Sequence, residues 1–102
     1  RILNFIVRRR NSAVRLLYYD NLRTYAHGGG HACRWQLKVD GRDCPSGAIG
    51  GDVYIWGWRN THRPRTIIGY CKGLRTGRHQ LKVYVTSTPG QRHANCYTGW
   101  YG

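Results

Sequence analysis

The chain has 102 residues, with 17 Lys and Arg against 4 acidic residues, so its formal net charge is +13. A chain of this length forms one domain, which we place at residues 1–102, and no segment approaches the roughly 20 apolar residues of a membrane span. The charge favours polyanionic partners such as acidic glycans, nucleic acid or an anionic membrane; the alternative is a basic surface that serves solubility alone.

The first half of the chain predicts strands separated by turns. Residues 2–7 are apolar and are expected to form a strand that is buried or lies in an interface. Residues 11–19 are expected to form a strand that stops at Asp20-Asn21, with a helix as the alternative. Residues 27–31 (His-Gly-Gly-Gly-His) predict a flexible loop. Residues 32–39 alternate between apolar and polar side chains, as in a half-buried strand, and the Asp40-Gly41 pair that follows predicts a hairpin turn.

The second half continues this pattern. Residues 44–51 are expected to form a connection rich in Pro and Gly, residues 53–58 a strand, and residues 59–65 a basic loop. Two further strands are expected at 66–74 and 80–88. Short strands of this kind, together with 14 glycines and 13% aromatic residues, predict an all-β antiparallel sandwich, jelly roll or barrel.

The cysteines indicate an oxidising compartment. An even number of cysteines without any C-x-x-C pair favours two disulfides over a zinc site; the residues are Cys33, Cys44, Cys71 and Cys96. Three pairings are possible. We prefer Cys33–Cys96 with Cys44–Cys71. Cys33 and Cys44 bracket a predicted hairpin, and they would be far apart only if the two arms of that hairpin are of unequal length. The first residue is Arg1 rather than Met, which we interpret as the mark of a processed product.

An aromatic segment followed by a basic one is the main candidate for binding. Tyr54, Trp56 and Trp58 are expected to share one strand face, where exposed rings would stack on sugars or bases; if buried, they would pack in the sheet or in a subunit interface. The basic residues that follow supply donors for hydroxyl, carboxylate and sulfate groups, although a solvated loop is the alternative. The candidate ligand-binding residues are Trp56, Trp58, Arg59, Asn60, His62, Arg63 and Arg65.

No pattern marks a catalytic or metal site. No Ser or Cys stands out as a nucleophile once the thiols are paired, and no spacing of His and Lys marks an acid–base site. His27 and His31 flank the glycines, but two ligands do not make a metal site. We therefore expect a protein that is not an enzyme and that uses no metal and no cofactor.

Several motifs occur in an order that is typical of one family. They are Asn11–Leu17, Ala32–Trp35, Asp40–Cys44, Ile67–Leu74 and Cys96–Trp100. This ordered set, with its four cysteines, resembles the C-terminal globular domain of the collagen triple helix repeat-containing protein family. The resemblance implies a jelly-roll fold like that of complement C1q and tumour necrosis factor, secretion, a homotrimer, and a role in the extracellular matrix or in signalling. The sequence differs from the family in being far more basic and in containing no collagen Gly-X-Y segment, and no ligand residues are carried over.

Three functions follow from these patterns. The first is a secreted, lectin-like protein that binds anionic or amino-sugar glycans without being an enzyme. The second is a cytolytic or defence protein, a toxin, that acts on an anionic membrane surface, since cationic and Trp-rich or Tyr-rich chains suit that interface. The third is a matrix or signalling ligand that contacts a receptor through protein surface. Nucleic acid is expected to bind only non-specifically.

Overall fold

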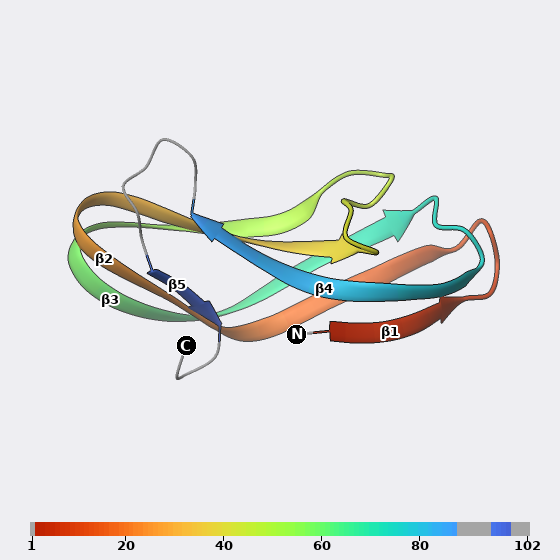
Figure 1. Cartoon of the computed structure of the whole chain (residues 1–102), viewed down its shortest axis with the longest axis horizontal. Coiled ribbons are helices and arrows are strands. Elements are labelled where there is room, and N and C mark those ends of the chain that lie inside the picture. Colours follow the sequence, from red (N-terminus) through yellow and green to blue (C-terminus); the bar gives the residue numbers. More distant parts are fainter. Residues whose placement is uncertain (1, 88–94, 99–102) are drawn as a thin grey trace. The chain divides into compact units, whose positions relative to one another are not determined.

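The computed structural model is built from β-strands and contains no helix in the part of the chain that it describes, which is residues 2–87 and 95–98, with the backbone alone for residues 26–29, 31, 58, 59 and 95. The strands are β1 (Ile2–Val7), β2 (Ala13–Val39), β3 (Ile49–Lys72), β4 (Gly77–Ser87) and β5 (Asn95–Thr98) (Figure 1). They hydrogen-bond in the order β1-β4-β2-β3, and β5 pairs with β2.

The strand pairs with a defined register are antiparallel. β1 pairs with β4 from Ile2 opposite Lys82 to Val7 opposite Gly77. β5 pairs with β2 in the same sense, and Leu22 lies opposite Thr98. The all-β antiparallel fold class with two disulfides is confirmed, and it is consistent with a jelly-roll-like domain. The assignment of residues 1–102 to a single domain stays a prediction.

Strands β2 and β3 are longer than the sequence predicts. The strand at 11–19 is confirmed against the helical alternative, but it does not stop at Asp20-Asn21, where the Asp20 carboxylate accepts a hydrogen bond of 2.8 Å from the Asn21 amide. Residues 27–31 and 59–65, predicted to be loops, lie within β2 and β3 instead. Figure 1 shows that both ribbons bend back midway; because Gly57 adopts a φ of 89°, β3 can bend without strain.

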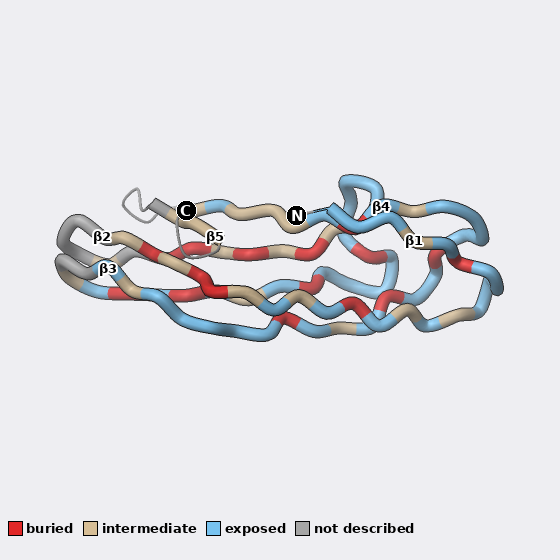
Figure 2. The backbone as a smooth tube through the Cα atoms, turned by 90° about the horizontal axis from the view of Figure 1, so that it is seen from below, coloured by how far each residue is buried: buried red, intermediate tan, exposed pale blue. Residues whose placement is uncertain are grey.

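Close contacts divide the chain into two units. Unit 1 comprises Arg1–Tyr18, Gln36–Gly50 and Ile67–Tyr84, and unit 2 comprises Tyr19–Trp35, Gly51–Thr66 and Val85–Gly102. The buried apolar side chains of unit 1 include Leu16, Leu37, Val39, Ile67, Cys71 and Leu81, and those of unit 2 include Leu22, Cys33, Trp35, Val53 and Ile55. Along the strands, buried residues alternate with more exposed ones (Figure 2), so each unit has a core of its own.

The hairpin turn predicted at Asp40-Gly41 is confirmed. Val39 and Arg42 exchange two backbone hydrogen bonds of 2.9 and 3.0 Å across it. Asp40 and Gly41 both have positive φ values, 53° and 76°, which are typical of a type I′ turn. Asp is one of the few residues other than Gly that tolerate this backbone conformation, so the local sequence accounts for the turn.

Each unit contains one disulfide, and the preferred pairing is confirmed. Cys44–Cys71 lies in unit 1 with a Cα–Cα distance of 5.5 Å, and Cys33–Cys96 lies in unit 2 with 5.8 Å. The sequence separations of 27 and 63 residues imply that each bridge stabilises the fold by roughly 3.5–4.5 kcal/mol, through the entropy of the unfolded chain.

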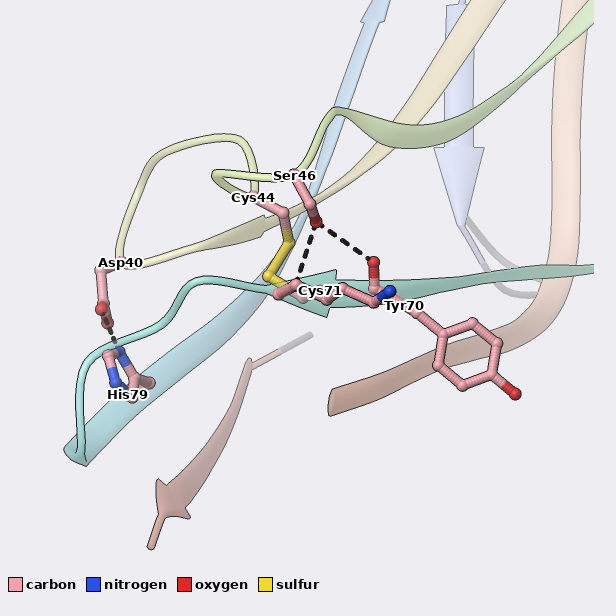
Figure 3. The surroundings of a disulfide bond; sticks show 7 residues. Asp40, Cys44, Ser46, Tyr70, Cys71 and His79 are labelled. Atoms are coloured by element: carbon pink, nitrogen blue, oxygen red, sulfur yellow. Dashed lines mark hydrogen bonds and ion pairs between the residues drawn. A yellow bond between two sulfur atoms is a disulfide. The ribbon is translucent and has the colours of Figure 1, made fainter. Parts of the chain in front are cut away.

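A serine ties the segment after the hairpin to the end of β3, next to the unit 1 disulfide (Figure 3). The Lys72 amide donates a hydrogen bond of 3.0 Å to Ser46 Oγ, and Ser46 Oγ donates one of 3.4 Å to the carbonyl oxygen of Tyr70. The side chain of Tyr70 points away from the disulfide. Cys44 and Ser46 therefore hold this short connection against β3 by one covalent bond and two hydrogen bonds.

The imidazole of His79 links the hairpin to β4. Its Nδ1 donates to Asp40 Oδ2 and its Nε2 donates to the Arg75 carbonyl oxygen, each at 2.6 Å. The ring also stacks on Phe5, with 5.6 Å between the centroids. Because both nitrogens face acceptors, the geometry suits the doubly protonated ring. The carbonyl of Arg75, and then the carboxylate of Asp40, raise the pKa of His79.

Strand β1 is not buried within the chain. Ile2, Leu3 and Ile6 are each more than half exposed, and only Val7 is buried. The expectation of a buried strand is therefore wrong for the single chain, because β1 pairs with β4 while most of its apolar side chains face away from the core. The alternative of an interface strand stays a prediction.

Because the pKa of His79 is raised in the folded state, protonation of its ring stabilises the fold. This contribution should be complete below about pH 6.5, the ordinary value for histidine, and should fall as the pH rises through the raised pKa. We expect the free energy of unfolding of the wild type to decrease over that range relative to His79→Gln. Urea unfolding of both proteins at a series of pH values measures the difference; parallel pH profiles would contradict the assignment.

Two tryptophans should respond differently to truncation. Trp35 is fully buried, and Trp56 is 67% exposed. Trp35→Ala should therefore lower the free energy of unfolding by about 3–5 kcal/mol, and Trp56→Ala by less than about 1 kcal/mol, as for other surface substitutions. Urea unfolding of the two variants measures this contrast. Similar losses in both would show that Trp56 is buried in solution.

Candidate functional site

The outer face of β3 in unit 2 carries exposed aromatic rings. Val53 and Ile55 are buried. Tyr54 and Trp56, which alternate with them along the strand, are 56% and 67% exposed. The alternation expected from the sequence is therefore confirmed for these residues, and the alternative of burial within the chain is wrong. The side chain of Trp58, expected on the same face, lies outside the described part of the structure.

Gly30 of β2 provides the surface on which these rings lie. A Cβ atom at Gly30 would stand 3.0 Å from the Trp56 ring and would collide with the Tyr54 hydroxyl. A side chain at Gly30 would therefore require the Tyr54 hydroxyl and the Trp56 ring to shift. Gly30 thus lies close to the Trp56 ring and to the Tyr54 hydroxyl, while both side chains stay more than half exposed.

Asp52 organises the arginines beside these rings. Its carboxylate accepts two hydrogen bonds from Arg34, with Nε–Oδ1 at 2.8 Å and Nη2–Oδ2 at 3.2 Å. Its backbone carbonyl oxygen accepts a third from Arg65 Nη1, at 2.7 Å. The hydrogen bonds from Arg34 lower the pKa of Asp52, and the positive charge of Arg65 lowers it further. The same hydrogen bonds raise the pKa of Arg34. Asp52 therefore stays ionised at neutral pH and fixes both guanidinium groups.

A pocket of about 330 Å³ lies between two segments of β3 in this unit, residues 52–54 and residues 63–65. It is lined by Asp52, Val53, Tyr54, Arg63, Pro64 and Arg65. Of the predicted binding residues, the structure therefore brings Arg63 and Arg65 together and adds the ring of Tyr54. Such a pocket offers guanidinium donors on one side and an apolar ring on the other, which suits an acidic sugar.

Two other predicted residues have different partners. Arg23 Nε donates a hydrogen bond of 2.8 Å to Asn60 Oδ1, and Arg23 also lies over the Tyr97 ring at 4.9 Å. Asn21 Nδ2 donates one of 2.8 Å to His62 Nδ1. Asn60 and His62 thus make contacts from β3 to β2 and do not line the pocket. The side chain of Arg59 lies outside the described part.

Sequence reasoning missed residues that complete this site. The sequence pattern puts Tyr54 on the aromatic face through its alternation with Val53, but the predicted set of binding residues does not include it. Asp52 and Arg34 gave no signal, because their contact depends on how β2 and β3 are placed side by side. The same holds for the contact between Arg23 and Asn60.

All four aspartate side chains of the chain make contacts within the described part of the structure. The ion pairs among the described residues are Arg34–Asp52, Lys38–Asp43 at 4.0 Å and His79–Asp40, and Asp20 bonds to a backbone amide. Exposed arginines without a carboxylate partner among these residues include Arg8, Arg9, Arg10, Arg15, Arg63 and Arg78. The positive charge is thus available to bind anions from outside.

A comparison with protein-family models identifies the family of this chain. Residues 2–102 match the family model described as CTHRC1, C-terminal domain, which confirms the resemblance to collagen triple helix repeat-containing proteins. No solved structure matches the chain. The family suggests an extracellular matrix or signalling protein of the collagen-repeat type, and the two disulfides fit a secreted protein. The chain therefore belongs to the CTHRC1 C-terminal domain family.

Proposed function

We propose that this chain is the globular binding domain of an extracellular matrix or signalling protein and that it binds sulfated or carboxylated glycans without being an enzyme. Family membership supports the extracellular role. The engagement of all four aspartate side chains within the described structure supports the choice of an anionic ligand. The proposal thus joins the matrix role to the glycan-binding role, with the glycan as the ligand.

The observation that carries this proposal is the absence of carboxylate partners for exposed arginines among the described residues, Arg63 among them. If the excess charge served folding, acidic residues would lie beside these guanidinium groups. Guanidinium groups bind sulfate and carboxylate through two parallel hydrogen bonds. A glycan chain would present many such groups along the basic surface.

Exposed rings favour a sugar over other polyanions. Tyr54 lies beside Arg63 and Arg65 in the pocket, and Trp56 on the same strand is 67% exposed. The apolar C–H face of a sugar stacks on such exposed rings. Nucleic acid would bind through its phosphates with little selectivity. An anionic membrane would attract the same charge, so leakage of anionic liposomes is the observation that would favour a cytolytic function.

We also propose that the domain is a homotrimer. The family resemblance motivates the three-fold state, and the exposed apolar side chains of β1 offer a surface to bury between subunits. Several weak glycan sites on one assembly would bind a repetitive chain more tightly than one site does. The net charge of +13 per chain opposes assembly, so bound anions should strengthen it.

Light scattering at physiological salt should give the mass of three chains. Leu3→Lys on β1 should shift the protein to monomers, because a charged side chain would enter an apolar contact. Leu17→Lys introduces the same charge at another exposed leucine, at 51% exposure, and should leave the mass unchanged. A monomer mass for the wild type, or equal effects of both variants, would argue against a trimer built on β1.

Affinity chromatography tests the ligand class. The wild type should be retained on heparin and released by salt, because exposed charges are screened over about 8–10 Å at moderate ionic strength. It should pass through a neutral-sugar column of the same matrix. Trp56→Ala should elute earlier from heparin if ring stacking contributes. Lack of retention on heparin at physiological salt would overturn the proposed function.

A further inference from the structure

We propose that the pocket formed by Tyr54, Arg63, Pro64 and Arg65 is a subsite for one sulfate group of an acidic sugar, with the sugar ring against Tyr54. The inference rests on the proposed function and deepens it, because it assigns one built site within a broadly basic surface. Its basis is the way in which Asp52 and Arg34 hold the pocket.

Arg65 is fixed without losing its charge. Its Nη1 donates to the backbone carbonyl oxygen of Asp52 at 2.7 Å, and a carbonyl oxygen carries no formal charge. One of its five N–H donors is used in this way, so the others stay available to an anion. A guanidinium held in place loses less conformational entropy on binding than a free one does.

The one carboxylate at the pocket is occupied. Both oxygens of Asp52 accept hydrogen bonds from Arg34, at 2.8 and 3.2 Å, so its negative charge is matched before a ligand arrives. The other residues that line the pocket are neutral or cationic. Arg63 and Arg65 therefore set its electrostatic character, and an anion entering it meets no unpaired negative charge.

The dimensions and the apolar surfaces suit a monosaccharide unit. The pocket volume of about 330 Å³ lies at the lower end of the range of ligand sites, roughly 300–1,000 Å³. Tyr54 gives an aromatic surface for the C–H face of a sugar, and Pro64 gives an apolar surface beside the arginines. A sulfate on that sugar would then lie within reach of both guanidinium groups.

Calorimetric titration with a sulfated heparin tetrasaccharide tests the subsite. Arg63→Ala and Arg65→Ala should each weaken binding by about tenfold or more. Arg15→Ala is the matched control, since Arg15 is exposed on unit 1 and has no carboxylate partner among the described residues; it should weaken binding no more than about twofold. Equal losses in all three variants would show diffuse charge attraction and overturn the subsite.

Lysine variants separate geometry from charge. Arg63→Lys and Arg65→Lys keep the net charge but lose the planar pair of donors. The subsite predicts that each weakens binding several-fold, whereas diffuse attraction predicts no change, which would overturn it. If an alanine variant does not fold, these variants carry the test, together with the amide chemical shifts of wild-type β3 on addition of the tetrasaccharide. Shift changes confined to residues 52–54, 63 and 65 support the subsite, and changes spread evenly over the basic surface contradict it.

The outcomes also separate this inference from the proposed function. Tetrasaccharide binding by the wild type with equal effects of Arg63→Ala and Arg15→Ala would leave the function in place and remove the subsite. No binding by the wild type would remove both. Tighter binding of a single-stranded DNA oligonucleotide of the same charge, through the same arginines, would assign the pocket to nucleic acid and overturn the sulfate proposal.

Discussion

All four aspartate side chains of this chain make a contact within the described part of the structure, and the rest of the account depends on that constraint. With 17 Lys and Arg against 4 acidic residues, the acidic side chains cannot neutralise the surface charge. They form hydrogen bonds and ion pairs within the chain instead. Asp40 joins the hairpin turn to β4 through His79 and the Gln80 amide. The carboxylate of Asp52 holds Arg34, while the backbone carbonyl of the same residue holds Arg65. The remaining guanidinium groups keep their charge for an external partner.

The features that the sequence predicts correctly depend on near neighbours. Asp40-Gly41 forms its turn because these two residues tolerate positive φ. The alternation of Val53 and Ile55 with Tyr54 and Trp56 places buried and exposed side chains as expected. The disulfide pairing is also confirmed, although spacing alone left three possibilities open.

The features that it does not predict depend on how distant strands meet. Residues 59–65 form a strand rather than a loop; their polar composition could not show that neighbouring strands supply hydrogen-bond partners to their backbone. The contact of Arg34 with Asp52 requires the register of β2 against β3, which no local pattern encodes. For that reason the predicted site contained Arg63 and Arg65 but not the residues that hold Arg65 in place or the ring of Tyr54 that completes the pocket.

The most direct test of the central claim is the affinity for a sulfated heparin tetrasaccharide as a function of salt concentration. If unpaired guanidinium groups bind the sulfates, the association constant should fall steadily as salt is added, because screening weakens exposed charge pairs. The fully desulfated tetrasaccharide should bind far more weakly at every salt concentration. An association constant that does not change with salt, or equal binding of the two tetrasaccharides, would contradict the account.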